Sequence, residues 1–395
     1  MKVMISAGEA SGDIHAAKLV EALRVSIAKA FPDTPEVECF GMGGSHLEKQ
    51  DVELLVDVEN NAVMGVLEVL HKYPSLRAGL TTLRKALTDR EPDILILVDY
   101  PHFNMKLATT ARELGIPVLF FIAPKVWASR PGRVSELKKI VDHMALILPF
   151  EKKLFDKGGV PNTYVGNPLL DNKLLLAAAD KTAVKNVATK KRIALLPGSR
   201  KSEVGMLLQP MLETCEALTS ADTELKGVSE IEFVLPVADT IKQEEVNAIL
   251  QKHKVDVTLI EPNDYNTLKA CDVALVASGT ATLELAILGI PMVVIYKLKA
   301  ISYQVLKRML ITEQISLVNI IAGKQVVPEI LQDEVTADKL SQEVGKLLTD
   351  EKARDEQIAE LAEVYKQLGK EGASRRCAEL AISLVHEKSA ELVAS

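Results

Sequence analysis

The stretch PDILILVDYP, residues 92–101, is followed by a helical segment and then by LGIPVLFF, residues 114–121. The same order returns in CDVALVASGT, residues 271–280, and LGIPMVVIY, residues 288–296. In each copy a continuous apolar run leads through a helix to a second apolar run, which is typical of parallel strands covered on both faces. The echo between the two halves predicts an α/β protein with two Rossmann-like domains.

Further apolar runs extend this pattern through both halves. They are MKVMISA (1–7), VECFGM (37–42), HMALILPF (143–150), NTYVG (162–166), IALLPG (193–198), IEFVLPV (231–237) and VTLI (257–260). We therefore expect domains at 1–168 and 169–350 that face a central cleft, because ligands of this fold class bind where the carboxyl ends of the strands meet. A C-terminal helical region, 351–395, follows, with a break at GKEGAS (369–374). Its last helix could cross back to the first domain or pack on a second subunit.

Composition narrows the class of protein. With 395 residues, 48% hydrophobic and 26% charged, the chain suits a globular protein with two cores. A net charge of −7 argues against a nucleic-acid partner. The four cysteines are far apart, which predicts a reducing compartment without a zinc site or disulfide framework. There is no signal-peptide pattern and no apolar run of bilayer length, so we expect a cytoplasmic protein.

The motif AGEASGD, residues 7–13, follows the first strand. Its two glycines permit a sharp turn or a close approach to a ligand. Ser11 or Asp13 could simply cap the next helix. Glu9 is harder to explain as structure, because a carboxylate buried in a glycine turn needs a partner. The spacing does not match a dinucleotide or P-loop fingerprint.

Two strand-to-helix turns in the second half predict a phosphate site. Their candidate residues are Gly198, Ser199 and Arg200 in LLPGSRKSEV, and Ser278, Gly279 and Thr280 in VASGTATLEL. Free N–H groups and the positive end of a helix attract anions, and hydroxyls and an arginine can add donors. Either turn alone could be ordinary helix capping, but together they favour phosphate binding. Glu284, one turn further, could accept hydrogen bonds from a ribose.

The ordered series of motifs resembles a known family. AGEASGD, GMGG, MGVLEVL, DYPHFN, APKVWASRPGRV, LPFE, YVGNPLLD, LLPGSRKSEV, ASGTATLE and PMVVIYK are similar to the motifs of lipid-A-disaccharide synthase, from about residue 1 to about residue 330. The resemblance implies a GT-B glycosyltransferase on the inner face of the inner membrane of a Gram-negative bacterium. It implies an inverting transfer from UDP-2,3-diacylglucosamine to 2,3-diacylglucosamine 1-phosphate (lipid X), which gives a β-1,6-linked disaccharide 1-phosphate and UDP. It also implies that no metal or cofactor is needed and that a homodimer forms.

Matching the motifs residue by residue carries the family's functional positions onto this chain. They fall on Glu9, Asp99, Arg200 and Asn319. The chain departs from the usual pattern at three places: His102 replaces an acid, Ser129 replaces a tryptophan, and Val318 replaces a proline. His102 leaves the role of a second acid open.

The chemistry of the implied reaction agrees with these positions. A sugar hydroxyl is a weak nucleophile, and a positioned base is worth roughly 10²–10⁴-fold in rate. Asp99, at the end of the strand DILILVD, is the first choice for that base and Glu9 the second. The departing UDP would meet Arg200 and the helix end at 279–282. Asn319 could donate to the diphosphate or to a sugar hydroxyl.

Acylated substrates call for a surface that meets the membrane. Residues 63–87 carry an apolar stripe at helical spacing with basic residues beside it, which suits an interfacial helix pair on an anionic membrane. The residues expected to face lipid are Val66, Leu67, Val69 and Leu70. The alternative is an amphipathic helix packed on its own sheet.

Two other classes of function share the fold. A UDP-sugar 2-epimerase would need the nucleotide site but no lipid surface, and a non-catalytic nucleotide-sugar sensor would need no acid at Asp99. The apolar stripe and Asp99 together favour the transferase.

Overall fold

The computed structural model describes residues 1–30, 37–58, 66–181, 190–220, 225, 227–299, 303, 312 and 314–394. The chain forms two compact units. Unit 1 comprises Met1–Asp171 with Gly369–Ser395, and unit 2 comprises Asn172–Leu368. The expected boundaries were 168/169 and 350/351. The region 351–395 is shared between the two units instead of standing alone, because its first helix packs in unit 2 and its second in unit 1.

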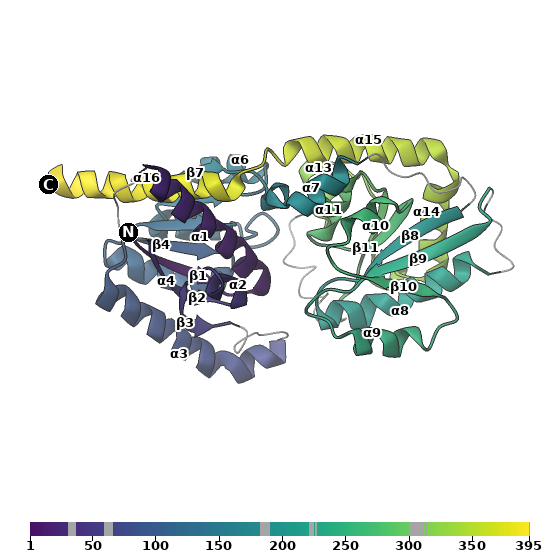
Figure 1. Ribbon diagram of the computed structural model, residues 1–395, viewed down its shortest axis with the longest axis horizontal. Helices are drawn as coiled ribbons and strands as arrows, with labels where there is room; N and C mark the ends of the chain where they lie inside the picture. Colours follow the sequence, from purple (N-terminus) through teal and green to yellow (C-terminus); the bar gives the residue numbers. More distant parts are fainter. Residues whose placement is uncertain are drawn as a thin grey trace. The chain divides into compact units, whose positions relative to one another are not determined.

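Unit 1 is a parallel sheet covered by helices on both faces (Figure 1). The strand order is β3-β2-β1-β4-β5-β6-β7. The strands are β1 (Lys2–Ala7), β2 (Glu38–Gly43), β3 (Glu53–Asp57), β4 (Ile94–Val98), β5 (Val118–Phe121), β6 (His143–Leu146) and β7 (Asn162–Tyr164). The helices are α1 (Ala10–Ala30), α2 (Ser45–Glu48), α3 (Val66–Arg90), α4 (Pro101–Glu113), α5 (Arg133–Ile140), α6 (Glu151–Gly158), the 3₁₀ turn η1 (Pro168–Asp171) and α16 (Ala373–Ala394).

The buried side chains of unit 1 alternate between two apolar layers. In β1, Val3 and Ile5 belong to one layer and Met4 to the other, as the period of two in a strand requires. The last helix, α16, lies along α1 (Figure 1). It contributes Cys377 and Ala378 to the layer of Val3, both fully buried. The prediction that the C-terminal helices cross back is therefore confirmed.

Asp171 fixes the start of α16. Its carboxylate accepts hydrogen bonds from the backbone N–H groups of Gly372 (2.6 Å), Ala373 (3.2 Å) and Ser374 (3.0 Å). A carboxylate at a helix N-terminus is favourable because it meets both unpaired N–H groups and the positive end of the dipole. The last residue of the first segment of unit 1 thus holds the first turn of its final helix.

Unit 2 repeats the design with a parallel sheet in the order β10-β9-β8-β11-β12-β13. The strands are β8 (Lys190–Leu196), β9 (Glu230–Pro236), β10 (Val257–Ile260), β11 (Val273–Ala277), β12 (Met292–Tyr296) and β13 (Glu329–Leu331). The helices are α7 (Lys173–Ala179), α8 (Lys201–Leu218), α9 (Gln243–Leu250), α10 (Tyr265–Lys269), α11 (Ala281–Leu288), α13 (Leu317–Ala322), η2 (Gln332–Glu334), α14 (Ala337–Thr349) and α15 (Glu351–Gln367).

The two sheets reverse their strand order at one point each, between β1 and β4 and between β8 and β11. In open parallel sheets, ligands bind beyond the carboxyl ends of the strands at such a point. The segments that leave these four strands are therefore the places to look for a site. They include AGEASGD, DYPHFN, LLPGSR and ASGTATLE.

The region 66–90 forms one helix with Pro74 inside it, so the expected helix pair is wrong. Leu83 and Leu87 are fully buried and pack in the layer that contains Met4. The C-terminal half of the predicted stripe is thus part of the core of unit 1. The side chains of Val66, Leu67, Val69 and Leu70 lie outside the described residues, so their expected contact with lipid stays a prediction. Over the described ranges, no helix has the length and apolar character needed to cross a bilayer.

Candidate active site

Asp99 and Tyr100 form an unusual turn at the carboxyl end of β4. Both have left-handed backbone angles, with φ of 48° at each. Residues other than glycine avoid this region, and each such position costs about 1–3 kcal/mol unless its surroundings hold it. Strain of this kind is common at functional sites, and it sets the half-buried Asp99 at the switch point of the sheet.

The buried side chain of Asn104 holds that turn. Its amide donates to the carbonyl oxygens of Asp99 (2.7 Å) and Ser6 (3.2 Å), and its oxygen accepts from the hydroxyl of Ser6 (2.6 Å). Asn104 therefore ties the end of β1 to the end of β4. Sequence reasoning missed this residue, although it is the last letter of DYPHFN and lies one helical turn after Tyr100.

The Tyr100 ring packs against the glycine turn that follows β1. A Cβ on Gly8 would lie 2.0 Å from Cδ1 of Tyr100, so only glycine fits there. Burial and the negative charge of Glu9 raise the pKa of Tyr100, which places Glu9 close to the Asp99 turn. Glu9 itself is exposed, so the expectation of a buried carboxylate is wrong.

Asp13, the last residue of AGEASGD, is buried and stabilises the turn after β2. Its carboxylate accepts from the backbone N–H groups of Gly44 (2.8 Å), His46 (2.9 Å) and Leu47 (3.2 Å). It thus caps α2 and not the helix in which it lies. Of the two acids in the motif, Asp13 is therefore structural.

In unit 2, the turn after β8 is occupied by a carboxylate of its own chain. Oε2 of Glu203 accepts from the backbone N–H groups of Ser199 (3.2 Å) and Arg200 (3.3 Å), and Oε1 accepts from the Arg200 guanidinium (2.8 Å). A Cβ on Gly198 would lie 2.4 Å from Oε2 of Glu203. The predicted free N–H groups of Ser199 and Arg200 are therefore wrong. The spacing of Arg200 and Glu203 is that of a capping box, a signal available in the sequence.

The Arg200 side chain remains 56% exposed, and a guanidinium has five N–H donors. Glu203 therefore orients the Arg200 side chain without using all of its N–H donors. Tyr296 is at the end of β12. The negative charge of Glu203 raises its pKa and the positive charge of Arg200 lowers it, so its hydroxyl lies close to this pair. Burial is the largest cause of the rise in that pKa.

The turn after β11 has the free donors that the other turn lacks. Within the described part of the chain, the N–H groups of Gly279, Thr280 and Ala281 form no hydrogen bond, and no side chain caps α11. The space beside Gly279 is open. The Ser278 hydroxyl donates to the carbonyl of Ile315 (3.0 Å), so it fixes the turn. The first turn of α11 can therefore receive an anion.

Glu284 lies at the end of the first turn of α11. Burial raises the pKa of its carboxyl. Its carboxylate accepts from the hydroxyl of Tyr265 (3.1 Å), which in turn accepts from the amide of Asn172 (3.1 Å). This chain of hydrogen bonds sets the orientation of the carboxylate, and its second oxygen, Oε2, can accept from a further donor.

Asn319 is fully buried, and its amide is saturated. It donates to the carbonyl of Val327 (3.0 Å) and to Glu329 (2.7 Å), and its oxygen accepts from the N–H groups of Val326 (2.7 Å) and Val327 (3.0 Å). Both N–H groups of the side-chain amide are used within unit 2, so the expected donation to a diphosphate or a sugar would require one of these bonds to break. Glu329 also accepts from the N–H groups of residues 315 and 316, and so ties Asn319 to the segment that holds Ser278.

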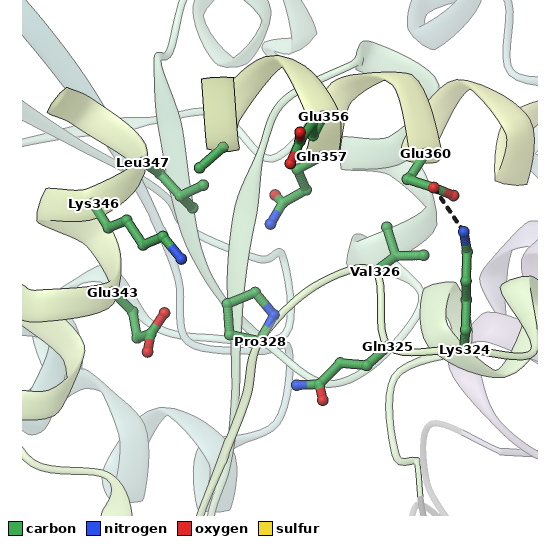
Figure 2. Close-up of a pocket in the computed structure, with 11 residues that line it drawn as sticks. Lys324, Gln325, Val326, Pro328, Glu343, Lys346, Leu347, Glu356, Gln357 and Glu360 are labelled. Atoms are coloured by element: carbon green, nitrogen blue, oxygen red, sulfur yellow. Dashed lines mark hydrogen bonds and ion pairs between the residues drawn. The ribbon is translucent and has the colours of Figure 1, made fainter. Parts of the chain in front are cut away.

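A groove in unit 2 lies away from these turns. A groove of about 360 Å³ is lined by Lys324, Gln325, Val326, Pro328, Glu343, Lys346, Leu347, Ala353, Glu356, Gln357 and Glu360 (Figure 2). Gln357 accepts from the N–H of Met292, the first residue of β12. The groove is therefore at the amino ends of the strands, opposite to the turns that follow β8 and β11. In unit 1 a small, mostly apolar cavity lies beside Gly8, Tyr100 and Phe103.

Across the described ranges, no group of three or more His, Cys, Asp or Glu side chains is arranged to hold a metal ion.

Solved structures with the same architecture define the class of protein. The glycotransferase of kitacinnamycin aligns over 97% of this chain and 98% of its own, with a TM-score of 0.63 and 16% identity. MurG from Acinetobacter baumannii aligns over 97% and 99%, with a TM-score of 0.55 and 14% identity. UDP-GlcNAc 2-epimerase from Neisseria meningitidis, solved with UDP-GlcNAc, aligns over 98% and 100%, with a TM-score of 0.59 and 13% identity. The fold is that of the GT-B glycosyltransferases.

Sequence relatives narrow the class to a family. The family model described as lipid-A-disaccharide synthetase matches residues 3–383. Lipid-A-disaccharide synthase of Geobacter sulfurreducens is 38% identical over 387 residues, which is 97% of each chain. The enzyme of Trichlorobacter lovleyi is 39% identical over 388 residues, which is 98% of each chain. The chain belongs to the lipid-A-disaccharide synthase family, and it is a glycosyltransferase of lipid A synthesis.

Proposed function

We propose that the chain transfers 2,3-diacylglucosamine from its UDP derivative to the 6-hydroxyl of 2,3-diacylglucosamine 1-phosphate, with inversion at the anomeric carbon. The products are UDP and a β-1,6-linked disaccharide 1-phosphate. Membership of the family supports this reaction. The structural observation that carries it is the strained turn that fixes Asp99 at the switch point of unit 1.

Unit 2 binds the UDP part of the donor in this proposal. The diphosphate accepts from the N–H groups of Gly279, Thr280 and Ala281 and from the Arg200 guanidinium, while the Glu284 carboxylate accepts from the ribose hydroxyls. A neighbour of the same fold was solved with UDP-GlcNAc, which supports a UDP-sugar as the ligand. Because charge grows on the diphosphate as it leaves, these donors also stabilise the transition state.

Unit 1 supplies the base. Asp99 takes the proton from the acceptor 6-hydroxyl as its oxygen forms the new bond to the anomeric carbon, and the bond from that carbon to UDP breaks. The proton ends on Asp99, and the electron pair ends on UDP. Glu9 is the alternative base, since it lies near the same turn. Asn104 and Asn319 act as positioning residues for the two units.

The acyl chains of both substrates place the reaction at a membrane. In this proposal Val66, Leu67, Val69 and Leu70 at the start of α3 enter the anionic inner face of the inner membrane of a Gram-negative bacterium. We propose further that the active form is a homodimer.

The experiment that tests the reaction measures UDP release from UDP-2,3-diacylglucosamine with and without the monosaccharide 1-phosphate in detergent micelles. Release that needs the acceptor supports the transferase. An altered donor sugar without acceptor would identify an epimerase, and binding without turnover would identify a sensor.

Asp99→Asn tests the base. The variant should keep its fold, because the amide has the shape of the carboxylate, and should lose roughly 10²-fold or more in turnover. Glu9→Gln is the matched variant. If Asp99→Asn keeps near-normal turnover and Glu9→Gln loses it, the base is Glu9.

A further inference from the structure

Two arginines of unit 1 converge on one imidazole nitrogen. Nη1 of Arg130 lies 3.3 Å, and Nη2 of Arg133 lies 3.1 Å, from Nε2 of His102. A guanidinium can only donate hydrogen bonds, so Nε2 must be the acceptor and the ring proton must be on Nδ1. His102 is therefore neutral and brings two cations together without cancelling either charge.

The charged groups around this cluster also favour a neutral His102. Burial and the positive charges of Arg133, Arg130 and Lys106 lower the pKa of His102. Burial and the charge of Arg130 lower the pKa of Arg133, and the charge of Glu136 only partly offsets this. Neither arginine forms an ion pair with a carboxylate of the described residues. Among the described residues, the neutral ring of His102 and the partial effect of Glu136 therefore leave much of this positive charge uncompensated.

The cluster is at the same edge of the sheet as Asp99. His102 is in the first turn of α4, which follows β4, and Arg130 is in the segment that follows the neighbouring strand β5. The carboxyl ends of adjacent parallel strands meet at one edge, so a ligand that contacts Asp99 can also reach this cluster.

The segment that carries Arg130 is held in place by contacts between Trp127 and residues 148–151. Trp127 donates from Nε1 to Oε1 of the buried Glu151 (3.2 Å), and its ring packs edge-on against Phe150 with centroids 5.2 Å apart. Oε2 of Glu151 accepts from the N–H of Leu148 (3.1 Å). These contacts fix the backbone beside the arginine and reduce the ordering that an anion would have to impose.

We propose that Arg130 and Arg133 bind the phosphate monoester of the acceptor substrate. This inference rests on the proposed function, in which the acceptor carries a 1-phosphate. A phosphate monoester has close to two negative charges and several acceptor oxygens, and guanidinium groups match it in pairs of parallel hydrogen bonds. Each arginine uses one donor on His102, so most of its donors remain for the ligand. The bound phosphate would balance the two positive charges and orient the sugar hydroxyl towards Asp99.

The test measures equilibrium binding of 2,3-diacylglucosamine 1-phosphate and of its dephosphorylated form, in neutral detergent micelles without donor. The parent protein should prefer the phosphorylated form. Arg130→Gln and Arg133→Gln should each lower that preference roughly tenfold, because each removes a charge-assisted contact. Arg375→Gln, an exposed cation of α16 paired with Glu379, is the matched control and should change nothing. Equal loss for both amphiphiles, or an unchanged preference, would overturn the proposal.

Two further measurements distinguish a lipid headgroup from the substrate phosphate, and the phosphate site from the proposed transferase reaction. Binding to vesicles of phosphatidylglycerol and phosphatidylethanolamine is measured for the same variants. If they lose vesicle binding but keep the preference in micelles, the cluster binds lipid headgroups and the acceptor site is wrong. If the parent prefers the phosphorylated amphiphile through these arginines but releases no UDP with it, the phosphate site stands and the proposed transferase reaction fails.

Discussion

Replacing Asn104 by alanine should separate the geometry of the site from its chemistry. The side chain is fully buried, and its loss leaves the hydroxyl of Ser6 and the carbonyl of Asp99 without their partner. A buried polar group left unsatisfied costs about 1–3 kcal/mol, so the two together should lower the free energy of unfolding by about 2–6 kcal/mol. For a unit of this size that corresponds to a melting temperature lower by on the order of 10 °C, which leaves the protein folded at 25 °C.

Turnover should fall much more than the remaining folded population explains. The left-handed turn at Asp99 and Tyr100 stores about 1–3 kcal/mol at each residue, and without Asn104 it can relax. A shift of about 1 Å in a reacting group can cost about 10²-fold, so UDP release should drop by roughly 10- to 100-fold. UDP affinity, measured by calorimetry, should stay the same because unit 2 is untouched.

The matched control is Asn162→Ala, which removes a side chain bonded to Asp156 and Val160, away from the Asp99 turn. It should not change the turnover of the folded protein. The reasoning would be refuted by an Asn104→Ala protein that melts lower but releases UDP within about threefold of the parent, since the turn would then not depend on this amide.

Three other predictions concern the nucleotide, the pH and the membrane. Arg200→Ala should weaken UDP binding roughly tenfold in calorimetry, and a chelator should leave turnover unchanged; unaltered UDP affinity would remove Arg200 from the site. Burial raises the pKa of Glu151 to about 7. The folded state therefore holds this proton more tightly than the unfolded state, and stability should fall by about 3 kcal/mol as pH rises from about 4.5 to 7, then level off. Urea unfolding of the parent against Glu151→Gln checks this, and a difference that does not vary with pH contradicts it. Val66, Leu67 and Leu70 changed together to serine should release the protein from anionic vesicles without lowering its melting temperature; if they are core residues, each should cost about 2–5 kcal/mol instead.

The sequence was sufficient for the architecture because buried parallel strands are continuous apolar runs. It did not indicate β3 or β13, which lie at the edges of their sheets. The segment ELLVD of β3 begins and ends with a charge and is mostly half-buried, and β13 has only the residues Glu329–Leu331. Short edge strands gain their structure from a neighbour, and their own pattern is too weak to show it.

At the site, the sequence located the turns but not the state of their donors. The two glycine turns of unit 2 have similar sequences. Glu203 accepts from the N–H groups of the turn after β8, whereas no side chain of the described residues caps the turn after β11. Asn319 lies in a matching motif, but its amide is used up within the chain. Which polar group is free depends on contacts between distant segments, and no single motif records them.

The order in which the chain is synthesised gives α16 a further consequence. Residues 1–171 leave the ribosome with the layer around Val3 and Ile5 still waiting for Cys377 and Ala378. Unit 2, which is continuous from Asn172 to Leu368, is complete before that helix exists. The second unit can thus mature first, while the part of this apolar layer that α16 covers stays exposed in the nascent first unit throughout the translation of about two hundred residues. During that interval the unfinished unit is the part of the protein most exposed to aggregation and to capture by chaperones.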